Sequence, residues 1–129
     1  MMAARSGLMR ALLRLVFALL LAQVLPARAQ AALLRVEAVA PGVWALVGPI
    51  GGPSRDNHAL NATYGVLATP QGTILIDSGA SAQGAQLLAT MAQQLTGQPV
   101  RWVINTGSQH HRWLGNSHLR QSGAQVIAH

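Results

Sequence analysis

The stretch Thr73-Ile74-Leu75-Ile76-Asp77-Ser78-Gly79 decides the fold of this chain. Its first four residues are apolar or β-branched and follow a tight turn at Pro70-Gln71-Gly72. A run of this kind predicts a strand that is covered on both of its faces. Asp77 comes directly after the strand, and we expect its carboxylate to leave the core there. The stretch therefore predicts a buried strand that ends in a polar loop.

A helix and a second apolar strand follow this stretch. Ser81 is a suitable helix N-cap, and apolar residues then recur at helical spacing, at Ala85, Leu88, Ala92 and Leu95. Gly97 and Pro99 end the helix, and residues 100–104 form the next apolar strand. This order of elements predicts an α/β layered sheet. Ligand sites in such sheets gather at the carboxyl ends of the strands.

Further strands flank this unit on both sides. Residues 33–39 and 43–47 are separated by Pro41-Gly42 and predict a β-hairpin whose first strand is half-buried. The remaining predicted elements are a loop at 48–57, a strand at 61–68, a polar loop at 105–115, a short helix at 116–121 and a strand that opens at 125–128.

The first 29 residues have the features of a secretory signal peptide. Three arginines open the segment: Arg5, Arg10 and Arg14. An almost wholly apolar run at 15–25 follows, and Ala27-Arg28-Ala29 places small residues where signal peptidase reads them. We expect cleavage between Ala29 and Gln30 and a periplasmic or secreted protein. No stable membrane span would remain, because the run is shorter than the roughly 20 residues that a span needs. The alternative is an uncleaved anchor, which would make this a small membrane-anchored protein.

Charge and cysteine content narrow the choice of partners and ligands. Four of the nine arginines lie in the predicted signal peptide, so residues 30–129 keep five arginines against three acidic residues, a net charge of +2. No basic stripe interleaved with aromatic residues remains, and we expect no nucleic-acid partner. Since the chain has no cysteine, a metal site would use His, carboxylate or amide oxygen ligands.

Residues 43–129 resemble the metallo-β-lactamase superfamily. In that family an apolar strand ends in Asp-x-Gly before the first helix. The next strand ends in Asn-Thr and runs into His-x-His-x-Asp-His, followed shortly by Gly-Asn. The matching residues here are Asp77-Ser78-Gly79, Asn105-Thr106 and Gly115-Asn116. The resemblance implies an αβ/βα sandwich of two similar halves. Residues 30–129 would form part of one such domain, its first half.

The metal-binding segment departs from the family pattern. The match places Gly107 at the first His and Gln109 at the second, and we assign His110 to the Asp position and His111 to the last His. The resemblance then makes His111 the expected zinc ligand and His110 a candidate ligand. Adjacent residues of an extended segment point to opposite sides, so these two imidazoles would not readily share one ion.

The resemblance implies roles for three other residues. Asp77 would hold the metal-binding loop in place without being a metal ligand itself. His58, in a loop that borders the active-site groove in this family, and Gln109 would be weak contacts to a small-molecule substrate.

The segment Gln109-His110-His111-Arg112-Trp113-Leu114-Gly115-Asn116 is similar to one subgroup of exported superfamily members, which is linked to quinoprotein relay systems. Gly and Gln at the two leading His positions belong to the pattern expected of that subgroup, whereas His110 replaces an Asp. The similarity implies a periplasmic oxidoreductase as partner.

Two functions follow from the resemblance. The first is an exported zinc-dependent hydrolase, whose metal-activated water attacks an ester, thioester or amide-type bond. The alternative is a non-catalytic periplasmic binding protein with the same fold. Because the family fold has two halves, we expect a truncated chain that is inactive alone, with the remaining metal ligands beyond residue 129.

Overall fold

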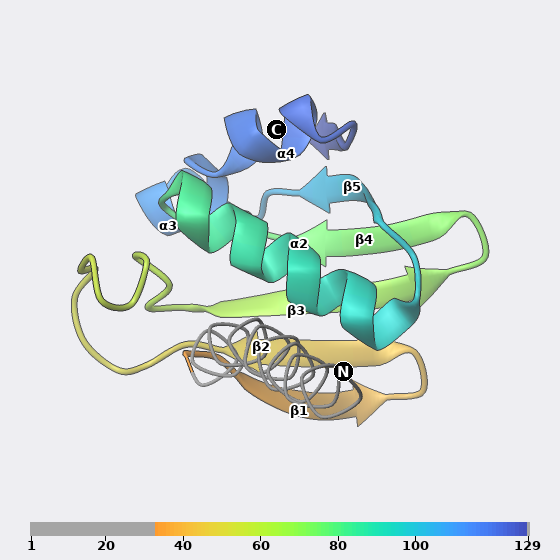
Figure 1. Ribbon diagram of the computed structural model, residues 1–129, viewed down its shortest axis with the longest axis horizontal. Helices are drawn as coiled ribbons and strands as arrows, with labels where there is room; N and C mark the ends of the chain where they lie inside the picture. The colour runs from red at the N-terminus through yellow and green to blue at the C-terminus, as the bar shows by residue number, and fades with distance from the viewer. Residues whose placement is uncertain (1–32, 129) are drawn as a thin grey trace, which may run out of the picture. The chain divides into compact units, whose positions relative to one another are not determined.

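The computed structural model describes residues 33–128, and the predicted signal peptide at 1–29 lies outside the described residues. The described part forms one six-stranded sheet in the order β1-β2-β3-β4-β5-β6 (Figure 1). The strands are β1 (Arg35–Ala40), β2 (Val43–Val47), β3 (Thr63–Thr69), β4 (Gly72–Ile76), β5 (Val100–Ile104) and β6 (Gln125–Ile127). The helices are α2 (Ala82–Thr96), α3 (His110–Trp113) and α4 (Asn116–Gln121). The predicted α/β sheet is confirmed.

The sheet has an antiparallel part and a parallel part. The first four strands form a meander of antiparallel neighbours, and the predicted hairpin of β1 and β2 is its first pair. The strands β5 and β6 each run parallel to the strand before them. A parallel neighbour requires a crossover, and α2 provides the one between β4 and β5, while α3 and α4 lie between β5 and β6. The carboxyl ends of β4, β5 and β6 therefore meet at one edge of the sheet.

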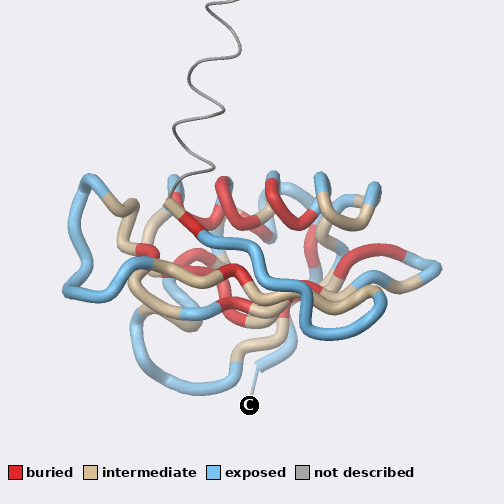
Figure 2. The backbone as a smooth tube through the Cα atoms, turned by 90° about the horizontal axis from the view of Figure 1, so that it is seen from below, coloured by how far each residue is buried: buried red, intermediate tan, exposed pale blue. Residues whose placement is uncertain are grey.

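The core lies between the sheet and the helices α2 and α4, which contact each other and the strands beneath them. Figure 2 shows the buried segments gathered between the long helix and the sheet. Tyr64, Val66, Leu75 and Val103 on the strands are fully buried, as is Leu88 on α2. Tyr64 and Val66 are two residues apart on β3, which places their side chains on one face. Leu75 pairs in register with Val66 on one side and with Val103 on the other, so all four share that face.

The opposite face of the sheet is apolar and only partly covered within the described residues. Ile74 and Ile76 alternate with buried Leu75, and they pair in register with Trp102 and Ile104 on β5. All four side chains are half-buried. The expectation that this strand is covered on both faces is therefore not met in the described part of the chain. The expectation of a half-buried first strand is wrong as well, because every residue of β1 is exposed.

Both predicted ends of α2 are confirmed. The Ser81 hydroxyl accepts a hydrogen bond from the Gly84 amide at 2.9 Å. At the other end Gly97 has φ of 74°, and its amide donates to the Gln93 carbonyl at 2.8 Å. Glycine adopts this left-handed conformation without the steric cost that a Cβ brings. The helix therefore stops where the chain must turn into β5.

The predicted polar loop at 105–115 contains a single helical turn, α3. The amide of Leu114 donates to the His110 carbonyl at 3.1 Å, and the Trp113 indole donates to the Ser108 carbonyl at 3.0 Å. These contacts order a segment whose polar composition indicated a loop. Across residues 33–128, the helices are too short or too polar to cross a membrane.

Tyr64 carries the one buried polar side-chain group that lacks a hydrogen-bond partner in the described part of the chain. Its ring is fully buried, and no hydrogen bond satisfies its hydroxyl. Burial, together with the charge of Asp77, raises the pKa of Tyr64 to about 12. The phenol therefore stays protonated in the folded chain at pH values where it ionises in the unfolded chain.

Tyr64 is the only tyrosine of the chain, so its titration can be followed alone by absorbance at 295 nm. We expect a midpoint near 12 in the folded protein. Because the unfolded chain loses this proton first, stability should fall between pH 10 and pH 12, by an amount on the order of 2 kcal/mol. The Tyr64→Phe variant should lack this decline and be at least as stable at neutral pH, since it removes an unsatisfied hydroxyl. A folded-state midpoint near 10 would contradict the burial of the hydroxyl.

Candidate functional site

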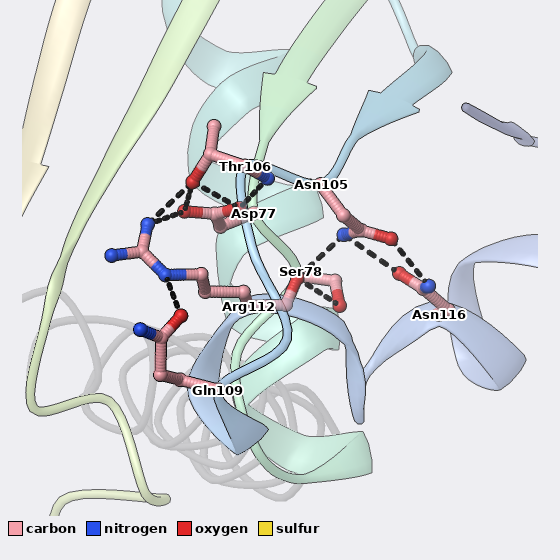
Figure 3. A network of polar contacts seen from close by, with 7 residues as sticks. All are labelled: Asp77, Ser78, Asn105, Thr106, Gln109, Arg112 and Asn116. Carbon is pink, nitrogen blue, oxygen red and sulfur yellow. Dashed lines mark hydrogen bonds and ion pairs between the residues drawn. The ribbon is translucent and has the colours of Figure 1, made fainter. Parts of the chain in front are cut away.

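Asp77 is the centre of a polar cluster at the carboxyl ends of β4 and β5 (Figure 3). It leaves the strand with φ of 64°, which is uncommon for a residue other than glycine. Its side chain is only 5% exposed. The Thr106 amide donates to Asp77 Oδ1 at 2.8 Å, and the Thr106 hydroxyl donates to Oδ2 at 2.8 Å. The expectation that this carboxylate leaves the core is wrong, and it stays buried because these donors replace water.

Arg112 supplies the opposite charge from α3. Its Nη1 lies 3.1 Å from Asp77 Oδ2 and also donates to the Thr106 hydroxyl. Its Nε donates to Gln109 Oε1 at 2.6 Å. The backbone carbonyl of Arg112 accepts the Ser78 amide at 3.0 Å. Arg112 therefore fastens the loop after β5 to the end of β4 through both its side chain and its backbone.

The Asn-Thr and Gly-Asn pairs hold the two ends of this loop together. Asn116 Nδ2 donates to Asn105 Oδ1 at 2.6 Å, and Asn105 Nδ2 donates back to Asn116 Oδ1 at 3.2 Å. The Gly115 amide donates to the Gly79 carbonyl at 2.9 Å. A Cβ on Gly115 would lie 2.0 Å from the Ser78 carbonyl oxygen, so two backbones approach too closely for any other residue. These matched pairs have a structural role.

His110 and His111 lie on α3 and not on an extended segment. Adjacent side chains of a helix point about 100° apart, whereas those of a strand point to opposite sides. Both residues line one depression of about 410 Å³ together with Gln109 and Ala80. His110 is exposed and His111 is half-buried. The structure thus brings three predicted site residues to the same surface, next to the Asp77 cluster.

His58 lies apart from these residues. It belongs to the loop before β3, has φ of 50°, and its carbonyl accepts a hydrogen bond from the Ser81 hydroxyl at 2.5 Å. It lines a different depression with Arg55 and Gln83. Its predicted contact with a substrate stays a prediction.

Sequence reasoning assigned no role to Thr106 or Arg112. One feature of the sequence could have indicated a partner for Asp77. A carboxylate that directly follows an apolar strand needs a counter-charge if it is buried. Arg112 is the arginine inside the matched segment 105–116. Its contact with Asp77, which is 35 residues away in the chain, is a tertiary feature that no local pattern displays.

Solved structures with the same fold identify it as the metallo-β-lactamase fold, although no family model and no curated protein matches the sequence. The metallo-β-lactamase FIM-1 from Pseudomonas aeruginosa, in its mono-zinc form, has a TM-score of 0.60 and 17% identity over 74% of this chain and 41% of its own. A metallo-β-lactamase from Hirschia baltica has 0.60 and 16%, covering 74% and 42%. One from Pontibacter korlensis has 0.60 and 19%, covering 74% and 43%. This chain spans about two fifths of the length of these structures.

Zinc fits the residues of this edge only in part. The family spacing, counted strictly from Gly107, places its ligands at 107, 109, 111 and 112. His111 then stands at the Asp position and Arg112 at the last His, one residue later than the assignment made above. Glycine offers no donor atom, Gln109 Oε1 already accepts a hydrogen bond from Arg112, and a guanidinium is not a metal ligand. Positions 107, 109 and 112 therefore do not fit zinc.

The two imidazoles are suitable zinc ligands in kind but not in number. Within residues 33–128, no group of three or more His, Cys, Asp or Glu side chains is placed to hold a metal ion. A zinc ion at His110 and His111 would need further ligands from outside the described residues.

The burial of Asp77 gives a stability prediction. Asp77→Asn removes the charge that Arg112 pairs with, and we expect a loss of about 1–3 kcal/mol. Asp77→Ala removes every acceptor as well and should cost roughly 3 kcal/mol or more. Urea denaturation measures both values. Asp56→Asn is the matched control, because Asp56 is exposed in a loop. Equal midpoints for the Asp77→Asn and Asp56→Asn variants would show that the buried ion pair does not stabilise the fold.

Proposed function

We propose that this chain is part of an exported metal-dependent hydrolase of the metallo-β-lactamase fold. The observation that carries the proposal is the depression at the carboxyl ends of the strands, where His110, His111 and Gln109 meet. Two imidazoles at the ligand-binding edge of an α/β sheet are suited to hold a metal and to contact a small substrate. In this proposal His111 is the principal ligand, because it is the less exposed of the two histidines.

The residues behind the depression would position these ligands. Asp77 and Arg112 join β4 to α3, and Gln109 is held by Arg112 at the start of the same helical turn. A ligand whose rotation and backbone are restrained in this way loses less entropy when it binds. Asp77 would thus hold the metal-binding loop through its contacts with Arg112 and Thr106. It would not contact the metal itself, as the resemblance implies.

Zinc, when bound, would supply a water whose pKa is lowered enough to give hydroxide near neutral pH. The substrates proposed on this basis are small molecules with an ester, thioester or amide-type bond. The chain's own contribution would be the imidazoles and the polar edge of the depression. The remaining ligands would come from a part of the protein outside the described residues.

The uncovered face of the sheet supports a second layer. Ile74, Ile76, Trp102 and Ile104 form an apolar surface that is only half-buried, and Ile127 at its edge is 48% exposed. Apolar surfaces of this kind mark interfaces. We therefore propose that the described residues are the first half of an αβ/βα sandwich, whose second half would cover this face. The proposal of the quinoprotein-linked subgroup, with a periplasmic oxidoreductase partner, rests on the segment 107–116 alone.

The second candidate function is binding without catalysis. It is favoured by the residues at 107, 109 and 112, where glycine, an amide and a guanidinium stand at ligand positions of the family. Such a protein would keep the depression beside α3 as a binding surface and would bind no zinc.

Zinc affinity separates the two candidates. The hydrolase proposal predicts that the purified chain binds Zn²⁺ in a titration, weakly because it supplies only part of the ligand set, and that His111→Ala lowers this affinity at least severalfold, because an imidazole ligand is lost. His118→Ala is the matched control, since His118 lies on α4 and lines a different depression. The same zinc affinity in the parent protein, the His111→Ala variant and the His118→Ala variant would contradict a zinc site at His111 and favour the binding protein.

Export is tested by the N-terminus of the mature protein. We expect intact mass and N-terminal sequencing of the periplasmic fraction to give a chain that begins at Gln30. Replacing Ala29 with Leu should block cleavage, because signal peptidase requires a small residue there. A full-length chain in the membrane fraction for both forms would instead identify an uncleaved anchor.

A further inference from the structure

Gly107 lies beside the side chains of Gln109 and Arg112, close enough that any side chain at 107 would meet both of them. A Cβ built on Gly107 would lie 2.7 Å from Gln109 Oε1, 3.0 Å from Arg112 Cδ and 3.2 Å from Arg112 Nε. These positions are the first, third and sixth of the family's metal-binding spacing. The backbone therefore presents three ligand positions to a common point, and the Arg112 side chain passes through it.

Gly107 is needed for room and not for its backbone conformation. The glycines with positive φ are found elsewhere in the described residues, and Gly107 is not among them. Any side chain at 107 would press on Gln109 and Arg112 as they now stand. The glycine and the arginine are therefore complementary, because one leaves the space that the other fills.

The guanidinium meets its partners as a bound cation would. Arg112 donates from Nη1 to Asp77 Oδ2 at 3.1 Å and from Nε to Gln109 Oε1 at 2.6 Å, and it also reaches the Thr106 hydroxyl. Asp77 is buried and requires a positive charge close by. An amide oxygen suits a guanidinium well, whereas it is a poor zinc ligand beside imidazole.

We infer that the Arg112 guanidinium is a built-in cation that takes the place of a metal ion where positions 107, 109 and 112 converge. The chain thereby balances the Asp77 charge and orders the loop without depending on a metal at this point. A second cation is disfavoured there by charge repulsion, which is strong at such short range. The inference does not depend on the proposed hydrolysis, since that proposal places zinc at His111.

The first test measures the coupling between Gly107 and Arg112. Gly107→Ala should lower the urea midpoint of unfolding, whereas Gly52→Ala should leave it nearly unchanged, because a Cβ at Gly52 meets open space. In the Arg112→Ala background the effect of Gly107→Ala should shrink by at least half, since the Arg112 atoms are gone and Gln109 Oε1, which Arg112 Nε now holds 2.7 Å from the new Cβ, is free to turn away. Equal effects in both backgrounds would overturn the inference. If Arg112→Ala does not fold, Arg112→Ala is combined with Asp77→Asn, which removes the unpaired buried charge, and the same reduction is expected because neither Cδ nor Nε of Arg112 remains at that place.

The second test asks whether removal of the cation opens the site to zinc. The chain that carries Gly107→His and Gln109→His is titrated with Zn²⁺ alone, with and without Arg112→Ala, in the His111→Ala background to remove the other proposed site. We expect affinity to rise about tenfold or more when Arg112 is absent, since its repulsion and its bulk are both removed. Equal zinc affinity with and without Arg112 would overturn the inference. Both readouts are independent of hydrolysis, so either proposal can fail without the other.

Discussion

A single buried carboxylate organises the ligand-binding edge of this protein. Asp77 stands where β4 ends, almost fully enclosed, with one hydroxyl, one backbone amide and one guanidinium as its partners. An ionised group in such a place is stable only if its hydration is replaced. The chain meets this requirement by bending Thr106 and Arg112 back toward β4. The contacts of Arg112 with Asp77 and Thr106 thereby fasten α3 to the end of β4.

The sheet and its main helix could be predicted because their signals are local. The strands at 43–47 and 100–104 and the helix at 116–121 have the predicted bounds, and Ser81 and Gly97 cap α2 as expected. Each of these features rests on periodicity or on the backbone preference of one residue. The burial of β1 and of Ile74 was predicted wrongly. Sequence periodicity shows which residues share a face of a strand, but it does not show whether another layer covers that face.

The candidate site could be predicted only in outline. The carboxyl ends of β4 and β5 were expected to carry it, and the polar cluster lies there. The expected zinc roles of His110 and His111 remain predictions, although the two residues do line one depression. The role of Arg112 was missed because its partners are distant in sequence and because its position coincides with a family ligand only when the spacing is counted from Gly107. A residue that replaces a ligand can preserve the charge of a site while changing its chemistry.

The strand order has a consequence for how this molecule forms. Each strand of the sheet pairs with the strand that precedes it in the chain. Short loop closures cost little entropy, and folds built from them tend to assemble quickly. The pairings within the meander from β1 to β4 therefore need no helix between the strands, whereas the contact between Asp77 and Arg112 joins residues 35 apart, across α2 and β5. Without β5 beside it, β4 would be an edge strand. The unpaired carboxylate of Asp77 at its end would then disfavour pairing with other chains.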